Sequence, residues 1–150
     1  MEIERKYLVS SENLPQQLDQ FPHRKIVQSY LSANPTVRVR QDDRRFELTY
    51  KSRGLMARQE YNMDLPQSSY EILSSLKKGV TIEKTRYRIP LDDTLTVDLD
   101  IFHGIHAPLI LAEVEFPDLD AAHRFQAPTW FGEEVMNSGK YTNSNLSLSR

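Results

Sequence analysis

Charged side chains recur at every second position near the start of the chain and again near its end. Glu2, Glu4 and Lys6 have this spacing, and Glu113 and Glu115 repeat it. Carboxylate oxygens are the ligands that a hard cation such as Mg²⁺ or Mn²⁺ prefers, and two or more must converge to hold it. Converging carboxylates repel one another until the cation arrives. Carboxylates with this spacing could therefore converge on a divalent cation.

Basic side chains repeat the same spacing in other segments, among them Arg38 and Arg40, Lys51, Arg58, and Lys84 with Arg86 and Arg88. Arginine binds phosphate oxygens in pairs, whereas lysine binds them as a point charge. A cationic wall opposite a carboxylate cluster is what a polyphosphate held beside a divalent metal requires. Catalysis of phosphoryl transfer depends mainly on positioning the groups and neutralising charge, so this pattern suits that chemistry.

Apolar residues fill the alternate positions, and this period of two predicts β-strands. We expect strands at Glu2–Val9, Ile26–Ala33, Thr36–Arg40, Arg45–Ser52, Arg58–Leu65, Thr81–Ile89, Leu95–Phe102 and Leu109–Phe116. Helices are expected at Pro66–Lys78, after Ser11 and after Asp118. The short connections predict an α+β, mostly β fold, a closed eight-stranded antiparallel barrel with a few flanking helices, in a single domain over residues 1–150.

The charged faces of these strands have two interpretations. They could be the solvated side of a half-buried sheet, which is common in antiparallel sheets. They could instead line the inside of a barrel, with the apolar faces turned outward and covered by the helices. The near absence of serine, threonine and glutamine on these faces favours the second interpretation. So does the segregation of sign, since Lys84, Arg86 and Arg88 share one strand, whereas Asp98 and Asp100 share another.

The pentapeptide Glu2-Ile3-Glu4-Arg5-Lys6 resembles the ExExK signature of the CYTH superfamily, the triphosphate tunnel metalloenzymes. The resemblance continues in order along the chain through Arg38-Val39-Arg40, Thr49-Tyr50-Lys51, Arg58-Gln59-Glu60, Glu83-Lys84-Thr85-Arg86-Tyr87, Asp98-Leu99-Asp100-Ile101-Phe102, Ala112-Glu113-Val114-Glu115 and a closing segment from Trp130 to Leu146. The closing segment departs from the family pattern at Ser138-Gly139-Lys140-Tyr141. Together these motifs favour the lumen over the solvated face.

The resemblance implies a tunnel lined by the charged residues, with roles for each. Glu2, Glu4, Glu113 and Glu115 would hold Mg²⁺ or Mn²⁺. Lys6, Arg38, Arg40, Lys51, Arg58, Lys84, Arg86 and Lys140 would bind phosphate oxygens. Glu4, Glu115 and Lys6 would carry the catalytic step.

Metal-dependent hydrolysis of a small triphosphate, inorganic tripolyphosphate above all, is the activity that the resemblance implies. Two alternatives within the family are an adenylate cyclase of the class IV type and a thiamine triphosphatase. A third, of another class, is a non-catalytic polyphosphate-binding module. Clustered glutamates argue against the last, because binding an anion does not require them.

The composition of the chain limits the classes of partner that it can bind. The net charge of −2 offers no overall basic field for nucleic acid or for an acidic membrane surface, and no stretch is apolar enough to span a membrane. The absence of cysteine excludes a disulfide frame and thiolate chemistry. The charged opening MEIERKYLVS does not resemble a signal peptide, so we expect a cytoplasmic protein, with a homodimer as one option for its assembly.

Overall fold

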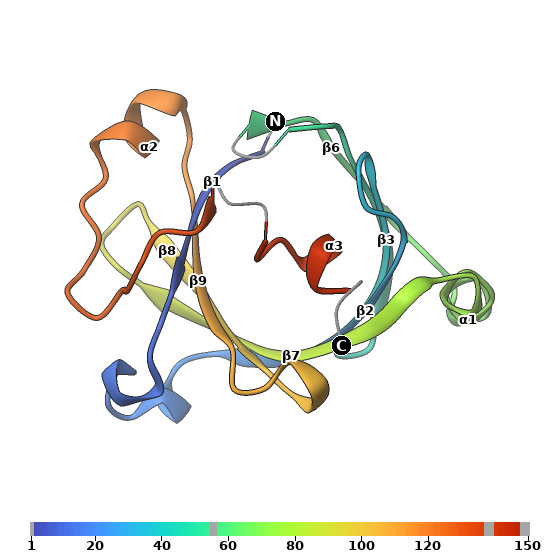
Figure 1. The fold of residues 1–150 in the computed structure, drawn as a ribbon, viewed down its shortest axis with the longest axis horizontal. Coiled ribbons are helices and arrows are strands. Elements are labelled where there is room, and N and C mark those ends of the chain that lie inside the picture. The colour runs from blue at the N-terminus through green and yellow to red at the C-terminus, as the bar shows by residue number, and fades with distance from the viewer. Residues whose placement is uncertain (1, 55–56, 137–139, 148–150) are drawn as a thin grey trace.

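A single antiparallel sheet curls into a barrel in the computed structural model, which describes residues 2–54, 57–136 and 140–147 (Figure 1). Its strand order is β5-β1-β9-β8-β7-β2-β3-β4-β6. The bounds are β1 Glu2–Leu8, β2 His23–Ser32, β3 Thr36–Asp42, β4 Arg45–Lys51, β5 Ala57–Arg58, β6 Glu60–Asp64, β7 Lys78–Pro90, β8 Thr96–Phe102 and β9 Ile110–Glu115. The predicted strands are confirmed, with one division.

That division closes the barrel. The strand expected at Arg58–Leu65 is split at Gln59 into β5 and β6, which lie at opposite ends of the sheet order. β5 pairs with β1 and β6 pairs with β4, so the chain itself joins the two edges. The Gln59 carbonyl accepts a hydrogen bond from the Ser52 amide at 2.9 Å, and the Ser52 hydroxyl accepts one from the Gln59 amide at 2.8 Å. Over the described residues the sheet therefore has nine strands rather than eight.

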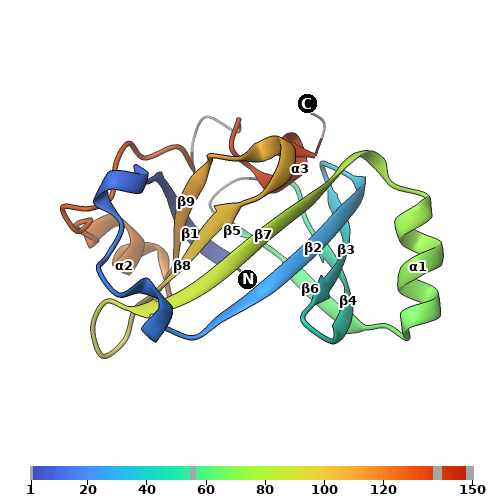
Figure 2. The same ribbon diagram turned by 90° about the horizontal axis from the view of Figure 1, so that it is seen from below.

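Helices lie outside the ring of strands, with one exception. α1 (Gln67–Ser75) and α2 (Leu119–Arg124) flank the barrel, and 3₁₀ turns η1 (Ser11–Asn13), η2 (Leu18–Gln20) and η3 (Gly104–His106) occupy loops. α3 (Asn143–Leu146) instead lies inside the ring, toward one end of the barrel (Figures 1 and 2). No helix in the described ranges is both long and apolar enough to cross a membrane.

The main apolar core lies on the outside of the barrel. Tyr7, Leu99 and Val114 are buried there, beneath α2 and the segment that follows it. Arg5, on the same face of β1, holds this cover in place by bonding Glu134 at 2.7 Å and the Ala122 carbonyl at 2.7 Å. On this side the apolar faces point outward and are covered, as expected.

The opposite outer face differs from the expectation. Phe46 of β4 packs on Tyr70 of α1, with ring centroids 4.9 Å apart. Farther along the same strands, however, Tyr50, Tyr61 and Met63 are exposed rather than covered by a helix. With nine residues, α1 is too short to cover both ends of these strands.

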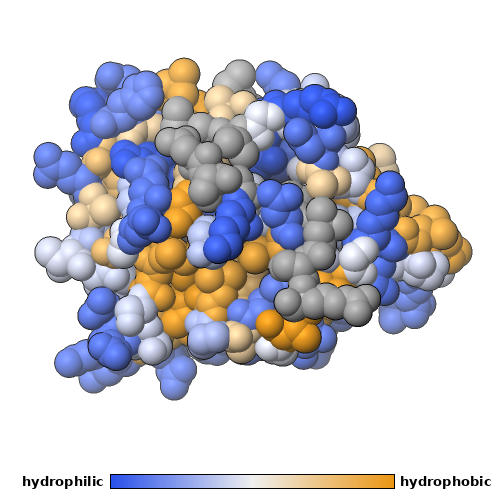
Figure 3. All heavy atoms as spheres, in the orientation of Figure 1, coloured by the Kyte–Doolittle hydropathy of each residue, from blue (hydrophilic) through white to orange (hydrophobic). Residues whose placement is uncertain are grey.

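A second apolar cluster lies inside the barrel, where only charge was expected. Its members are Tyr30, Ile82, Phe102, Leu111, Val135 and Leu146, all buried. Ile82, Phe102 and Leu111 share faces with charged neighbours two and four positions away. Leu146 belongs to α3. The lumen is therefore charged over part of its length and apolar at the end that α3 occupies. Seen from this end of the barrel, the space-filling view shows an apolar surface on the side where β9 lies (Figure 3).

Candidate active site

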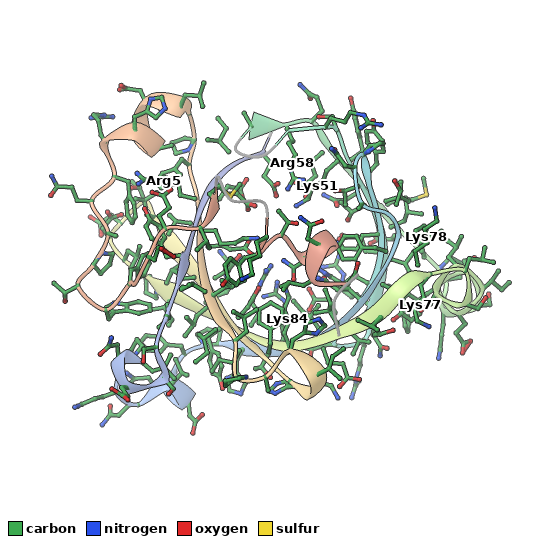
Figure 4. All side chains as sticks on the ribbon, in the orientation of Figure 1. Arg5, Lys51, Arg58, Lys77, Lys78 and Lys84 are labelled. Atoms are coloured by element: carbon green, nitrogen blue, oxygen red, sulfur yellow. The ribbon has the colours of Figure 1, made fainter. Side chains whose placement is uncertain are left out.

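One cavity of about 250 Å³ occupies the charged part of the lumen. Inward-facing positions of the strands form most of its wall. Its lining comprises Glu2, Glu4, Lys6, Arg24, Tyr30, Thr36, Arg38, Arg40, Lys51, Arg58, Glu60, Arg86, Arg88, Asp98, Glu113, Glu115, Met136, Thr142 and Asn143. The side chains of Lys51 and Arg58 point into the ring of strands, whereas Lys77 and Lys78 lie outside it (Figure 4). The predicted site residues are thus brought together, except Lys84 and Lys140.

Exposure along the strands shows which end of the lumen is open. On β7, Ile82 is fully buried, Arg86 is 8% exposed and the side chain of Arg88 is 53% exposed. On β9, Leu111 is fully buried, whereas Glu115 is exposed. Both strands run from the apolar α3 end toward solvent. The cavity is therefore closed by α3 on one side and opens beside Arg88 and Glu115.

The cationic wall is crowded and short of acceptors. Arg40 bonds Gln28 at 2.7 Å, and burial together with the charges of Arg38 and Arg86 lowers its pKa to about 9. Arg38 donates to Thr49 at 2.9 Å. The buried Nε atoms of Arg38 and Arg58 have no hydrogen-bond partner within the described residues. Unpaired buried donors are costly, so this wall is suited to an anion that would accept from them.

Lys84 lies behind this wall rather than in it. Its ammonium group is fully buried and bonds Asp100 at 2.7 Å, while Asp100 also accepts two bonds from Arg86 at 2.7 and 2.8 Å. Burial lowers the pKa of Lys84 to about 7, only partly opposed by Asp100. The Asp100 carboxylate raises the pKa of Arg86 against the effect of burial. Asp100 therefore fixes the Arg86 guanidinium, which does line the cavity.

The carboxylates divide into a neutralised pair and an unneutralised pair. Glu2 bonds Lys51 at 2.9 Å and approaches Arg58 at 3.3 Å. Glu113 lies 3.6 Å from Lys6, and despite its burial the nearby cations hold its pKa well below the usual range.

Glu4 and Glu115 form the unneutralised pair, directly opposite each other in the β1–β9 pairing. Among the described residues, the cation that comes within 4.0 Å of Glu4 is Arg58. Burial, then the charges of Glu113 and Glu2, raise its pKa to about 8. Burial, Glu2, Glu60 and Asp98 raise the pKa of Glu115.

These acids fit a divalent cation by chemistry, although they do not form a finished chelate. All are oxygen donors, and the raised pKa values of Glu4 and Glu115 mark a site that lacks positive charge. Among the described residues, no three acidic or histidine side chains converge closely enough to form a ready metal site. A cation would therefore have to draw the carboxylates together as it binds.

The C-terminal segment contributes residues that sequence analysis missed. Lys6 donates to the Tyr141 carbonyl at 3.2 Å, and Asn143 accepts from Gln28 at 3.1 Å and from Lys84 at 3.0 Å. Lys140 is exposed, 5.2 Å from the Tyr141 ring centroid, and does not line the cavity. Ser138 and Gly139, where the sequence departs from the family pattern, lie outside the described residues.

Arg24 is another lining residue that was missed, because the strand that carries it begins earlier than expected. β2 starts at His23 rather than Ile26, which brings Arg24 into phase with Gln28 and Tyr30 on the inner face. Arg24, Ile26, Gln28 and Tyr30 are two residues apart in sequence. Extending the expected strand three residues upstream, from Ile26 to His23, would have placed Arg24 on the inner face.

The family model described as the CYTH domain matches residues 1–145. The chain belongs to the CYTH family. Inorganic triphosphatases from two bacteria are similar to this CYTH chain over nearly their whole lengths. The protein from Nitrosomonas europaea is 42% identical over 99% of the chain and 97% of its own length. The protein from Acetivibrio thermocellus is 34% identical over 97% of the chain and 92% of its own length.

Solved structures are also similar to this CYTH barrel. A crystal structure of an inorganic triphosphatase superposes with a TM-score of 0.73 at 37% identity, covering 100% of this chain and 96% of that one. A Hippeastrum protein proposed as an adenylyl cyclase and described as having a dominant triphosphatase activity gives a TM-score of 0.63 at 18% identity, covering 82% and 83%. At 18% identity the likeness concerns the fold alone.

The raised pKa of Glu4 predicts how the metal-free CYTH protein responds to pH. Its folded pKa of about 8 exceeds the unfolded value of 4.5, so the folded state binds the extra proton and stability falls as pH rises between these values. Glu4→Gln should therefore raise Tm at pH 9 in chelator by at least about 3 °C, a shift worth roughly 1 kcal/mol in a domain of this size, and change it little at pH 4.5.

Thermal melts of the wild type, Glu4→Gln and Glu83→Gln at both pH values check this. Glu83 is an exposed residue of β7, so its substitution makes the same chemical change outside the lumen. A loss of stability in Glu4→Gln at pH 9 would contradict the assignment of Glu4 as an unneutralised buried carboxyl group.

Proposed function

We propose that this CYTH protein is a divalent-metal-dependent triphosphatase that hydrolyses inorganic tripolyphosphate to diphosphate and phosphate. The observation that carries the proposal is a single cavity in which an under-satisfied cationic wall meets under-neutralised carboxylates. Its support from comparison is the pair of inorganic triphosphatases that are 42% and 34% identical over nearly the whole chain.

The residues divide the work by charge. Lys6, Arg38, Arg40, Lys51, Arg58 and Arg86 bind the phosphate oxygens and neutralise the charge that develops on the leaving group. Glu2, Glu4, Glu113 and Glu115 hold Mg²⁺ or Mn²⁺, which when bound supplies positive charge at the phosphate oxygens. Glu115, at the open end, orients the attacking water. Lys84 acts indirectly, through its contact with Asp100, which in turn holds Arg86. Direct contact of Lys84 or Lys140 with the substrate stays a prediction.

Inorganic tripolyphosphate is preferred over nucleotides because the lining offers little to an organic group. Within the described lining, Tyr30 is the only aromatic residue. It packs in the apolar cluster toward α3. A nucleobase or a thiazolium ring would gain little from a wall of arginine, lysine and carboxylate. The cavity therefore favours the substrate that consists of phosphate alone.

Side-by-side assays test the proposed function. Phosphate release from tripolyphosphate, ATP and thiamine triphosphate is measured with Mg²⁺ or Mn²⁺, and cyclic AMP is measured with ATP. We expect the highest kcat/KM with tripolyphosphate and little or no cyclic AMP. Efficient cyclic AMP formation would assign a cyclase instead, preferred cleavage of thiamine triphosphate would assign that activity, and tight binding without any turnover would assign a binding module.

Two neighbours on β4 test whether the lumen binds the substrate. Lys51 points inward and bonds Glu2 at 2.9 Å, whereas Tyr50 points outward and is 38% exposed. Lys51→Ala removes a cation that binds phosphate before and during the reaction, so KM should rise at least about 10-fold, with a smaller fall in kcat. Tyr50→Phe should leave both constants within about twofold, because it changes only an exposed hydroxyl.

Steady-state kinetics with tripolyphosphate measure both effects, and a melt of each variant excludes unfolding as their cause. The inward-facing assignment of this strand would be refuted if Tyr50→Phe abolished turnover while Lys51→Ala left it intact.

A further inference from the structure

Arg40 is held in the wall of the cavity by a neutral side chain. Its Nε donates to Gln28 Oε1 at 2.7 Å, and within the described residues this is the hydrogen bond that fixes its guanidinium group. Arg86 is held differently, by two hydrogen bonds to the Asp100 carboxylate at 2.7 and 2.8 Å. Arg40 and Arg86 both line the cavity, so one wall contains two arginines that are positioned in different ways.

The surroundings of Arg40 make such a partner necessary. Arg40 is only 8% exposed, and the charges of Arg38 and Arg86 add to burial in lowering its pKa. Like charges repel strongly where water is excluded, and a buried Nε without an acceptor carries a further cost. Without Gln28, the Arg40 guanidinium would therefore gain by turning away from its neighbours.

The Gln28 amide is restricted to one orientation. Gln28 is fully buried on β2. Arg40 Nε can only donate, so Gln28 must present its oxygen there, and its Nε2 then donates to Asn143 Oδ1 at 3.1 Å. The Lys84 ammonium group donates to the same Asn143 oxygen at 3.0 Å and so fixes that amide in turn. Gln28 therefore cannot rotate away from Arg40 without breaking a second hydrogen bond.

An amide orients Arg40 without cancelling its charge. A carboxylate at this position would accept the same hydrogen bond but would also form an ion pair, as Asp100 does with Lys84 and Arg86. The neutral Gln28 oxygen uses only the Nε donor and leaves the two terminal nitrogens of Arg40 for an anion. The arrangement therefore presents a full positive charge in a fixed direction.

We propose that Gln28 is a positioning residue for triphosphate hydrolysis, which directs the Arg40 guanidinium toward the phosphate oxygens and keeps its charge available to them. This rests on the proposed function. Gln28 does not itself line the cavity in the described structure, so it acts through Arg40 rather than on the substrate.

Two substitutions of Gln28 separate orientation from charge. Gln28→Met keeps the length but removes the acceptor, so KM for tripolyphosphate should rise at least ~5-fold, with a smaller fall in kcat and a lower Tm. Gln28→Glu keeps the acceptor but pairs with the Arg40 charge. Its KM should also rise at least ~5-fold, although it should be the more stable of the two variants in a thermal melt. A purely structural role would make the change in KM follow the change in Tm.

The matched control is Gln20→Met. Gln20 is an exposed residue of η2, so this substitution makes the same chemical change outside the lumen. It should change neither KM nor Tm.

A double-mutant cycle shows whether Gln28 acts through Arg40. Arg40→Ala should raise KM at least ~10-fold, and adding Gln28→Met should then change KM less than about twofold, because the side chain that Gln28 positions is gone. Calorimetric titration with tripolyphosphate repeats the cycle as Kd values without turnover, with all four proteins in the Glu4→Gln background.

Two outcomes would overturn the proposal. If the effects of Gln28→Met and Arg40→Ala on KM multiply independently, Gln28 does not act through Arg40. If Gln28→Glu keeps the wild-type KM, the neutrality of the amide has no role. If the wild type does not hydrolyse tripolyphosphate, the proposed function fails, and the cycle of Kd values still decides the role of Gln28.

Discussion

Excess chelator is expected to abolish phosphate release from tripolyphosphate, and added Mg²⁺ or Mn²⁺ is expected to restore it. The reason lies in the acidic half of the cavity. Glu4 and Glu115 face each other without a close counter-ion, while Glu2 and Glu113 draw on Lys51 and Lys6. A tripolyphosphate placed against these carboxylates without a cation between them would meet repulsion rather than binding.

The measurement is initial rate against free metal concentration, with a chelator blank before and after readdition. A parallel melt should show a higher Tm when metal is present, because the cation binds the folded state alone. Undiminished hydrolysis in chelator would remove the metal from the mechanism and leave the carboxylates without an assigned role.

Glu4→Gln is expected to lower kcat for tripolyphosphate at least about 100-fold, a loss of roughly 2.7 kcal/mol of transition-state stabilisation. Glutamine keeps the size and one oxygen acceptor but removes the negative charge that would bind the metal. The loss should fall mainly on kcat, because the cationic wall that binds the substrate is untouched.

Glu83→Gln is the matched control, since it makes the same change on the outer face of β7 and should leave kcat unchanged. Activity and stability should change in opposite directions in Glu4→Gln. Compared with the wild type, this variant should be less active and, without metal at pH 9, more stable. A variant that loses both activity and stability would indicate that Glu4 is a structural residue.

Alternation along the sequence was enough to predict the strands and which charged residues share a face of the sheet. Side chains two apart must share a face, so Arg38 with Arg40 and Glu2 with Glu4 could be assigned to one side of the sheet. Alternation alone could not show which face lines the lumen, because a solvated face has the same period. That assignment required the segregation of positive and negative charges on different strands and the family resemblance.

Position along the barrel axis could not be predicted in the same way. It depends on the stagger between strands, and this is why the inward-facing Ile82 and Leu111 proved to lie at an apolar end while Lys84 lies behind the wall. The docking of α3 joins Lys6 to Tyr141 across 135 residues, a contact with no local signal. The division at Gln59 likewise follows from closing the barrel rather than from any turn-forming residue.

The apolar seal at the α3 end makes the lumen a blind tube in the described chain, and this imposes an order on what leaves it. If a triphosphate binds along this tube, cleavage would leave two fragments one behind the other, and the one nearer Leu111 and Phe102 would be blocked by the one nearer Arg88. The outer fragment must depart first, and while it remains the next substrate has no free path inward. Turnover is thereby tied to how quickly the guanidinium groups at the rim release an anion, so the affinity that captures a substrate also limits how fast the cycle can restart.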